Sequence, residues 1–120
     1  NMAKYTKKGS KTRELILDYA KKYFYEIGYN DTWIKNISSE SGIALGNITY
    51  YFKKKDDIVT EIYGSLMKKI DDRIIFSYPE IRAFERVFLS EVIFYHIINS
   101  CDNNKRFYYF VFKNTCLPIK

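Results

Sequence analysis

The chain has 120 residues, 47% of them apolar and 28% charged, which suits one ordinary domain or a small domain joined to part of another. No apolar run reaches the roughly 18 residues that a membrane-spanning helix requires, and the polar start gives no sign of a secretory signal. The two cysteines, Cys101 and Cys116, are too few for a disulfide framework and lack metal-binding partners at useful spacing. We therefore expect a cytoplasmic protein with reduced thiols and with neither a metal nor a cofactor.

The net charge of +6 belongs to the first half of the chain. Residues 1–55 hold 11 lysines and arginines against five acidic residues, whereas residues 56–120 hold nine of each kind. A basic segment joined to a neutral, more apolar one is typical of a module that binds a polyanion. A merely solvated basic surface is the alternative interpretation.

The first half predicts three helices. Residues 10–28 show helical periodicity and end at Gly28, where a left-handed C-terminal cap favours glycine. A shorter helix, capped by Thr32, is expected to end before Gly42, and a third spans about residues 45–52. The expected core residues are Ile16, Tyr19, Ala20, Tyr23, Phe24, Ile27, Ile34, Ile37, Ile48 and Phe52.

The second half also favours helices. A fourth helix is expected over about residues 56–75, with Asp56 and Asp57 at the positive end of its dipole. A fifth, over about residues 80–100, is apolar on almost every side, which predicts that it is buried. Residues 106–113 have the composition of a strand, but their all-helical context favours a helix. The expected fold class is all-α.

Two short helices joined by a tight turn with glycine, at residues 34–41 and 45–52, make a helix-turn-helix pattern. The first helix braces the second, which can then lie in a major groove about 12 Å wide. The pattern alone is weak, because many helical proteins contain such corners. Here it coincides with the basic half of the chain and with the run Lys53-Lys54-Lys55.

The stretch from Gly28 to Ile58, preceded by Arg13-Glu14-Leu15-Ile16, Ala20 and Phe24, resembles the DNA-binding signature of the TetR family. The resemblance covers roughly residues 10–70. It implies a homeodomain-like, three-helix DNA-binding domain at residues 10–58, linked by a fourth helix to about residue 75. Residues 76–120 would then be a partial helical domain for ligand binding and dimerisation. The implied function is a ligand-responsive transcription regulator, a repressor that binds a palindromic operator in double-stranded DNA as a homodimer.

By position, the resemblance also implies which side chains meet DNA. The third helix would read bases, and its flanks would hold phosphates. Asn47 is the best candidate for a base, since an amide pairs bidentately with adenine. Two positions depart from the family pattern: Thr49 stands where tyrosine is frequent, and Trp33 where serine or threonine is frequent, which suggests that Trp33 packs against protein. The residues assigned to DNA are Thr32, Leu45, Gly46, Asn47, Thr49, Tyr50, Tyr51 and Lys55; one of the two tyrosines has core packing as its alternative.

From Ile74 to Ile119, 26 of 46 residues are apolar and 11 are aromatic. A packed helical core and a pocket for a small apolar or aromatic effector both fit this composition. The single histidine, His96, is expected in the core or the pocket rather than at a metal, and no nucleophile–base pair argues for an enzyme. The pocket candidates are Tyr78, Phe88, Tyr95, His96, Tyr108 and Tyr109.

Two other classes stay open as alternatives. A basic peripheral membrane module would gather lysines and aromatic residues on one surface, and an RNA-binding module would need stacking platforms on a sheet or loop. The count of helices also leaves no room for the two long C-terminal helices that mediate dimerisation in the TetR family. We therefore expect a truncated regulatory domain, or self-association through residues 84–98 and 107–112.

Overall fold

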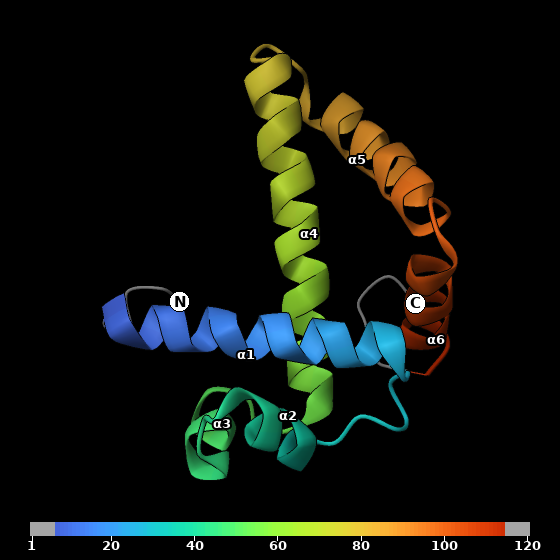
Figure 1. Ribbon diagram of the computed structural model, residues 1–120. Helices are drawn as coiled ribbons and strands as arrows, with labels where there is room; N and C mark the ends of the chain where they lie inside the picture. Colours follow the sequence, from blue (N-terminus) through green and yellow to red (C-terminus); the bar gives the residue numbers. More distant parts are fainter. Residues whose placement is uncertain (1–6, 115–120) are drawn as a thin grey trace. The chain divides into compact units, whose positions relative to one another are not determined.

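The computed structural model describes residues 7–114, which form six α-helices and contain no strand (Figure 1). The chain divides into two compact units, one ending at Thr60 and the other beginning at Glu61, so the border falls inside α4 (Lys55–Ser77). The predicted all-α fold class is confirmed. The ambiguous residues 106–113 lie within a helix, α6 (Asp102–Asn114), as their helical context favoured.

The first unit is built on α1 (Lys7–Glu26), with α2 (Ile34–Ser41) and α3 (Leu45–Tyr51) packed on the same side of it (Figure 1). Each fully buried aliphatic or aromatic side chain contributes about 1.5–3 kcal/mol to folding. Arg13 adds a cation–π contact from α1, its guanidinium lying 5.2 Å from the centre of the Phe52 ring. The residues of the predicted core that are buried here are Ile16, Ala20, Phe24, Ile37, Ile48 and Phe52.

Three residues of the core predicted for the first helix are not buried: Tyr19 and Tyr23 are half-buried, and Ile27 is exposed. The helix ends at Glu26, and Gly28 follows with a φ of +92°, a left-handed conformation that favours glycine. The Ile27 amide still donates to the carbonyl of Tyr23 at 2.9 Å, and the chain turns away from the helix at Gly28.

Hydrogen bonds fix the turn between α2 and α3. Gly42 caps α2 with a φ of +77°, and its amide donates to the carbonyl of Ser38 at 3.0 Å. The Ser38 hydroxyl donates to the carbonyl of Ile43 at 2.6 Å, and the Ile43 amide donates to the hydroxyl of Ser41 at 3.1 Å. These bonds hold the first helix of the pair at a set angle to the second.

The start of α4 has the predicted acidic residues. Asp56 and Asp57 lie in its first turn, where carboxylates interact favourably with the helix dipole. The Asp57 carboxylate also accepts a hydrogen bond from the amide of Lys54 at 3.3 Å.

In the second unit, α5 (Ala83–Ile98) and α6 pack with the later turns of α4 around aromatic rings. Phe94 of α5 contacts Tyr63 of α4 edge to face, with ring centres 5.5 Å apart, and Tyr108 of α6 at 5.4 Å. A partly exposed ion pair between Arg86 and Asp71, with Nε 3.4 Å from Oδ1, joins α5 to α4.

The prediction that the fifth helix is buried is wrong. Ser90 and Phe94 are the only buried residues of α5, and the side chains of Phe84 and Phe88 are 82% and 66% exposed. Among residues 7–114, only α4 and α6 pack against α5 within its unit. Because two neighbouring helices can cover only one side of α5, its other side is exposed. An all-round apolar composition therefore leaves a large apolar surface uncovered.

The first unit makes a prediction about stability. Ile48→Ala should lower the free energy of unfolding by about 2–5 kcal/mol, because it opens a cavity in the core between α1, α2 and α3. Leu45→Ala, on the exposed side of the same short helix, is the matched control and should cost much less. Urea denaturation followed by circular dichroism measures both, and equal losses would contradict the packing described for α3.

Candidate nucleic-acid interface

The outer face of α3 is the most accessible helical surface of the first unit's helix-turn-helix. Ile48 and Phe52 are buried and fix one side of this seven-residue helix. The opposite side must then face solvent, and the side chains of Leu45 and Tyr50 are 48% and 65% exposed. The predicted DNA-contacting residues that α3 exposes together are Leu45, Gly46, Asn47, Thr49 and Tyr50.

The start of α3 is open. A Cβ atom added at Gly46 would meet nothing within 4 Å, so its backbone is accessible to another molecule. Asn47, beside it, is exposed and offers both donor and acceptor atoms. Thr49 donates its hydroxyl proton to the carbonyl of Gly46 at 3.1 Å, which leaves its oxygen as an acceptor.

Two phenol groups lie at the other end of α3. The rings of Tyr50 and Tyr51 meet edge to face with centres 5.0 Å apart. Tyr51 is the half-buried member of the pair, and Tyr50 projects further into solvent. Neither ring belongs to the buried core of the unit.

Lys55, at the start of α4, is held by two aromatic rings in what we call the Lys55 clamp: Tyr29, Trp33, Lys55 and Asp56. The Lys55 ammonium lies 4.2 Å from the centre of the Tyr29 ring and 4.7 Å from that of Trp33. It also donates to the carbonyl of Tyr29 at 2.6 Å. Burial lowers the pKa of Lys55, and the charges of Asp56 and Asp31 partly offset that effect.

The same clamp orders the loop between α1 and α2. The Tyr29 hydroxyl donates to the Asp56 carboxylate, and the Tyr29 ring packs on Phe24 with centres 5.5 Å apart. Burial raises the pKa of Tyr29, and the hydrogen bond to Asp56 raises it further. The loop is thereby tied both to α1 and to the start of α4.

The prediction that Thr32 caps α2 is wrong. Thr32 is fully buried, and its hydroxyl donates backward to the carbonyl of Gly28 at 2.7 Å. Trp33 is the N-cap residue and forms no side-chain cap hydrogen bond, because an indole has no acceptor for a backbone amide; its ring lies beside the Lys55 ammonium instead. The Thr32 side chain therefore offers no accessible hydroxyl to DNA. Of the DNA contact predicted at this position, only the backbone amides that follow Thr32 are left.

Residues 16–62, which include this helix-turn-helix, match the family model described as bacterial regulatory proteins, tetR family. Over these residues the chain is similar to the TetR family. The recognition made from the stretch between Gly28 and Ile58 is thus confirmed.

Curated relatives match about half of the chain. The fatty acid metabolism regulator protein of Bacillus subtilis (strain 168) is 32% identical over 59 residues, which is 49% of this chain and 30% of that protein. The HTH-type transcriptional regulator AcrR of Shigella flexneri is 36% identical over 63 residues, 52% of this chain and 29% of that protein. The chain therefore spans about a third or less of the relatives that it matches. No solved structure matches it significantly.

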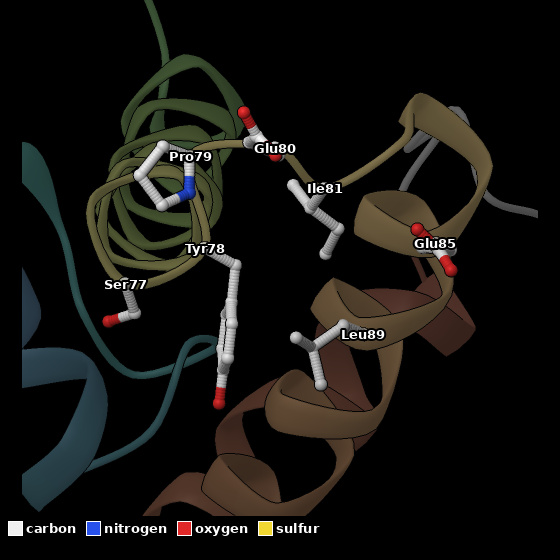
Figure 2. Close-up of a pocket in the computed structure, with 7 residues that line it drawn as sticks. All are labelled: Ser77, Tyr78, Pro79, Glu80, Ile81, Glu85 and Leu89. Atoms are coloured by element: carbon white, nitrogen blue, oxygen red, sulfur yellow. The ribbon is translucent and has the colours of Figure 1, made fainter.

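The six candidates for an effector pocket are not brought together in this chain. Tyr78 lines a pocket of about 570 Å³ at the turn between α4 and α5, where its ring, Ile81 and Leu89 face a common space (Figure 2). Phe88 and Tyr95 line a separate groove on α5. The other three candidates line neither space: His96 and Tyr109 are exposed, and Tyr108 is buried among aromatic rings.

The sequence pattern does not show which of these six side chains are buried and which are exposed. Tyr108 and Tyr109 are neighbours in sequence, but consecutive residues of a helix point about 100° apart, so one enters the core and the other does not. Within residues 7–114, no helix is both long and apolar enough to cross a membrane, and no three His, Cys, Asp or Glu side chains gather as metal ligands would.

The clamp makes a prediction about alkaline pH. Because the folded state raises the pKa of Tyr29 above its ordinary value of 10.0, the phenol stabilises the fold below that pH, and this stabilisation is lost as the pH rises through the folded-state value. When the pH rises above about 10, the free energy of unfolding should therefore fall less in Tyr29→Phe than in the wild type. Tyr19→Phe, on α1, is the control and should follow the wild-type curve. Identical pH dependence in all three proteins would mean that the Tyr29–Asp56 contact does not act in solution.

Proposed function

We propose that the protein is a DNA-binding transcription regulator, a repressor that responds to a small effector and binds a palindromic operator as a dimer. The observation that carries this proposal is the exposed outer face of α3, fixed from behind by Ile48 and Phe52 and flanked by Lys55. The names of the matched relatives, two of which are called regulators of metabolism or transcription, support it.

The outer face of α3 has the features of a major-groove reader. Gly46 lets the backbone approach the base edges closely, and Leu45 can contact a thymine methyl group. Asn47 then supplies an amide for bidentate pairing with adenine. Tyr50 and Tyr51, at the end of the helix, place hydroxyls where they reach backbone phosphates.

Lys55 supplies the second phosphate contact in this proposal. Its ammonium lies beside Trp33, the N-cap residue of α2. The first amides of α2, those of Ile34 and Lys35, have no acceptor within the helix and favour an anion there. A phosphate at this point would meet a positioned ammonium, whose charge is already partly desolvated by the clamp.

The effector part of the proposal rests on the pocket beside Tyr78. Its walls combine apolar side chains, Ile81 and Leu89, with the phenol of Tyr78 and the carboxylate of Glu80 (Figure 2). A volume of about 570 Å³ lies in the range of small-molecule sites. We propose a small apolar or aromatic molecule as the occupant.

The two alternative classes are less favoured. α5, which exposes several apolar side chains, contains no lysine, and its one arginine, Arg86, pairs with Asp71 of α4, whereas a peripheral membrane helix combines basic and apolar side chains on its exposed surface. An RNA-binding module would use aromatic platforms on a sheet or a loop, and residues 7–114 contain no strand to serve as such a platform.

The proposal predicts salt-dependent binding to duplex DNA. Fluorescence anisotropy with a library of promoter duplexes should find a palindromic site whose affinity falls steeply between about 50 and 200 mM salt, since bound phosphates release counterions. Lys55→Ala should weaken binding to all duplexes alike and reduce the salt slope by about one unit. Absence of binding to any duplex at low salt would overturn the proposed function.

The assignment of α3 can be tested with a pair of glycines. Gly46→Ala and Gly64→Ala both add a methyl group in open space on a helix, and each should stabilise the fold by up to about 1 kcal/mol. Gly46→Ala should nevertheless weaken DNA binding, because the methyl group stands between α3 and the groove, while Gly64→Ala should not.

Asn47→Ala completes that test, since it should relax preference at one base pair by about 1–3 kcal/mol. Equal DNA affinity in the two glycine variants, or unchanged preference in Asn47→Ala, would show that another surface faces the bases.

A further inference from the structure

The outer face of α3 carries no charge, although it lies in the basic half of the chain. The sequence of α3 is Leu-Gly-Asn-Ile-Thr-Tyr-Tyr, which contains no lysine, arginine, aspartate or glutamate. At its start the exposed residues are Ala44, which precedes the helix, and then Leu45, Gly46 and Asn47. The nearest lysines in the sequence lie in α2 and directly after α3. The positive charge and the surface of α3 therefore come from different residues.

Guanine is the base for which this surface is least suited. In the major groove guanine presents two hydrogen-bond acceptors, O6 and N7, which arginine or lysine satisfies. α3 has neither residue. Thr49 has a donor in its hydroxyl, but that proton goes to the carbonyl of Gly46 at 3.1 Å. α3 therefore lacks the cationic donors that guanine favours.

Asn47 is complementary to adenine instead. Among residues 7–114 its side-chain amide has no hydrogen-bond partner, so both its oxygen and its nitrogen are available. The amide offers an acceptor beside a donor, and adenine presents the matching pair, a donor at N6 and an acceptor at N7. On guanine the amide oxygen would face O6, which is itself an acceptor. Asn47 therefore favours adenine and disfavours guanine at the same position.

The aliphatic side chains beside Asn47 are complementary to thymine, the partner of adenine. Thymine carries a methyl group in the major groove, and apolar side chains contact it. Leu45 is 48% exposed, and Ala44 before it is exposed as well. Thr49 lies one turn after Leu45 on the same side of the helix and adds a further methyl group. Gly46 lets this surface approach the bases, since a Cβ there would meet nothing within 4 Å.

We infer that α3 reads A·T base pairs and no G·C pair, so that the DNA recognised by this chain has an A·T core in each half-site. The inference rests on the proposed function, because it takes the outer face of α3 to lie in a major groove. It adds the class of base pair that the groove must present. Lysines outside α3 then supply the salt-dependent attraction to phosphates, and the uncharged helix supplies the choice of sequence.

The first test is selection from a library of duplexes that carry an inverted repeat of randomised half-sites. We expect A·T pairs at the positions where Asn47→Ala and Leu45→Ala relax the preference. A G·C pair at those positions would overturn this inference and leave the proposed DNA binding intact. A library that yields no bound duplex at low salt would overturn the proposed function, and this inference with it.

The second test removes single atoms from the selected duplex and measures affinity by fluorescence anisotropy. Uracil in place of thymine lacks only the 5-methyl group, so at the position read by Leu45 the wild type should lose affinity by about fourfold. Leu45→Ala should lose much less on the same change. Leu15→Ala, which truncates a similarly exposed leucine of α1, is the matched control and should keep the full loss. Equal losses in the two variants would overturn the inference, because α3 would then not contact thymine.

The third test addresses the rejection of guanine. Asn47→Arg introduces the paired donors that match O6 and N7, so at one base pair it should prefer guanine over adenine by about tenfold, whereas the wild type prefers adenine. Replacing that adenine by 7-deazaadenine, which lacks the N7 acceptor, should weaken binding of the wild type and leave Asn47→Ala unaffected. A wild type that binds adenine and guanine equally there would overturn the inference. Circular dichroism confirms that each variant keeps its helices.

Discussion

The burial of Ile48 and Phe52 is the constraint on which the functional surface depends. A helix of seven residues has too few hydrogen bonds to be stable alone, so α3 exists because these two side chains are packed into the first unit. Once one side of so short a helix is fixed, the direction of the other side is fixed too. The hydrogen-bonded turn at Gly42 and the contact of Arg13 with Phe52 then leave α3 a single orientation relative to α1 and α2. For the DNA binding that we propose, that orientation decides which side chains can enter a groove.

In the Lys55 clamp, the residue before α2 contacts another side chain instead of capping the helix. A serine or threonine at the position of Trp33 would cap α2 through its hydroxyl. Here the hydroxyl of Thr32 turns back to Gly28, and Trp33 uses its indole to hold the Lys55 ammonium. The N-cap of α2 has no side-chain hydrogen bond, but the Lys55 ammonium has a defined position beside the rings of Tyr29 and Trp33. Asp56 connects this arrangement to Tyr29, so the loop before α2 and the start of α4 form one ordered site.

The sequence predicted the features that depend on local physics. Helical periodicity identified Ile16, Ala20 and Phe24 as core positions of α1, and Gly28 and Gly42 marked where two helices end, because both signals lie in neighbouring residues. Contacts between distant residues were not predictable in the same way. Trp33 and Lys55 are 22 positions apart, and nothing in their spacing shows that an indole lies over the ammonium. The exposure of Phe88 was missed because composition measures how apolar a helix is, whereas burial depends on how many neighbours cover it.

The central claim is that the outer face of α3, with the start of α2 beside it, is where this chain meets DNA. Chemical-shift mapping of the ¹⁵N-labelled full chain, titrated with its palindromic duplex, tests it directly. The account predicts the largest amide shifts at Gly46, Asn47 and Lys35, a clear shift of the indole N–H of Trp33, the only tryptophan, and small shifts along α6. Shifts concentrated in α6, with the amides of α3 unmoved, would contradict it.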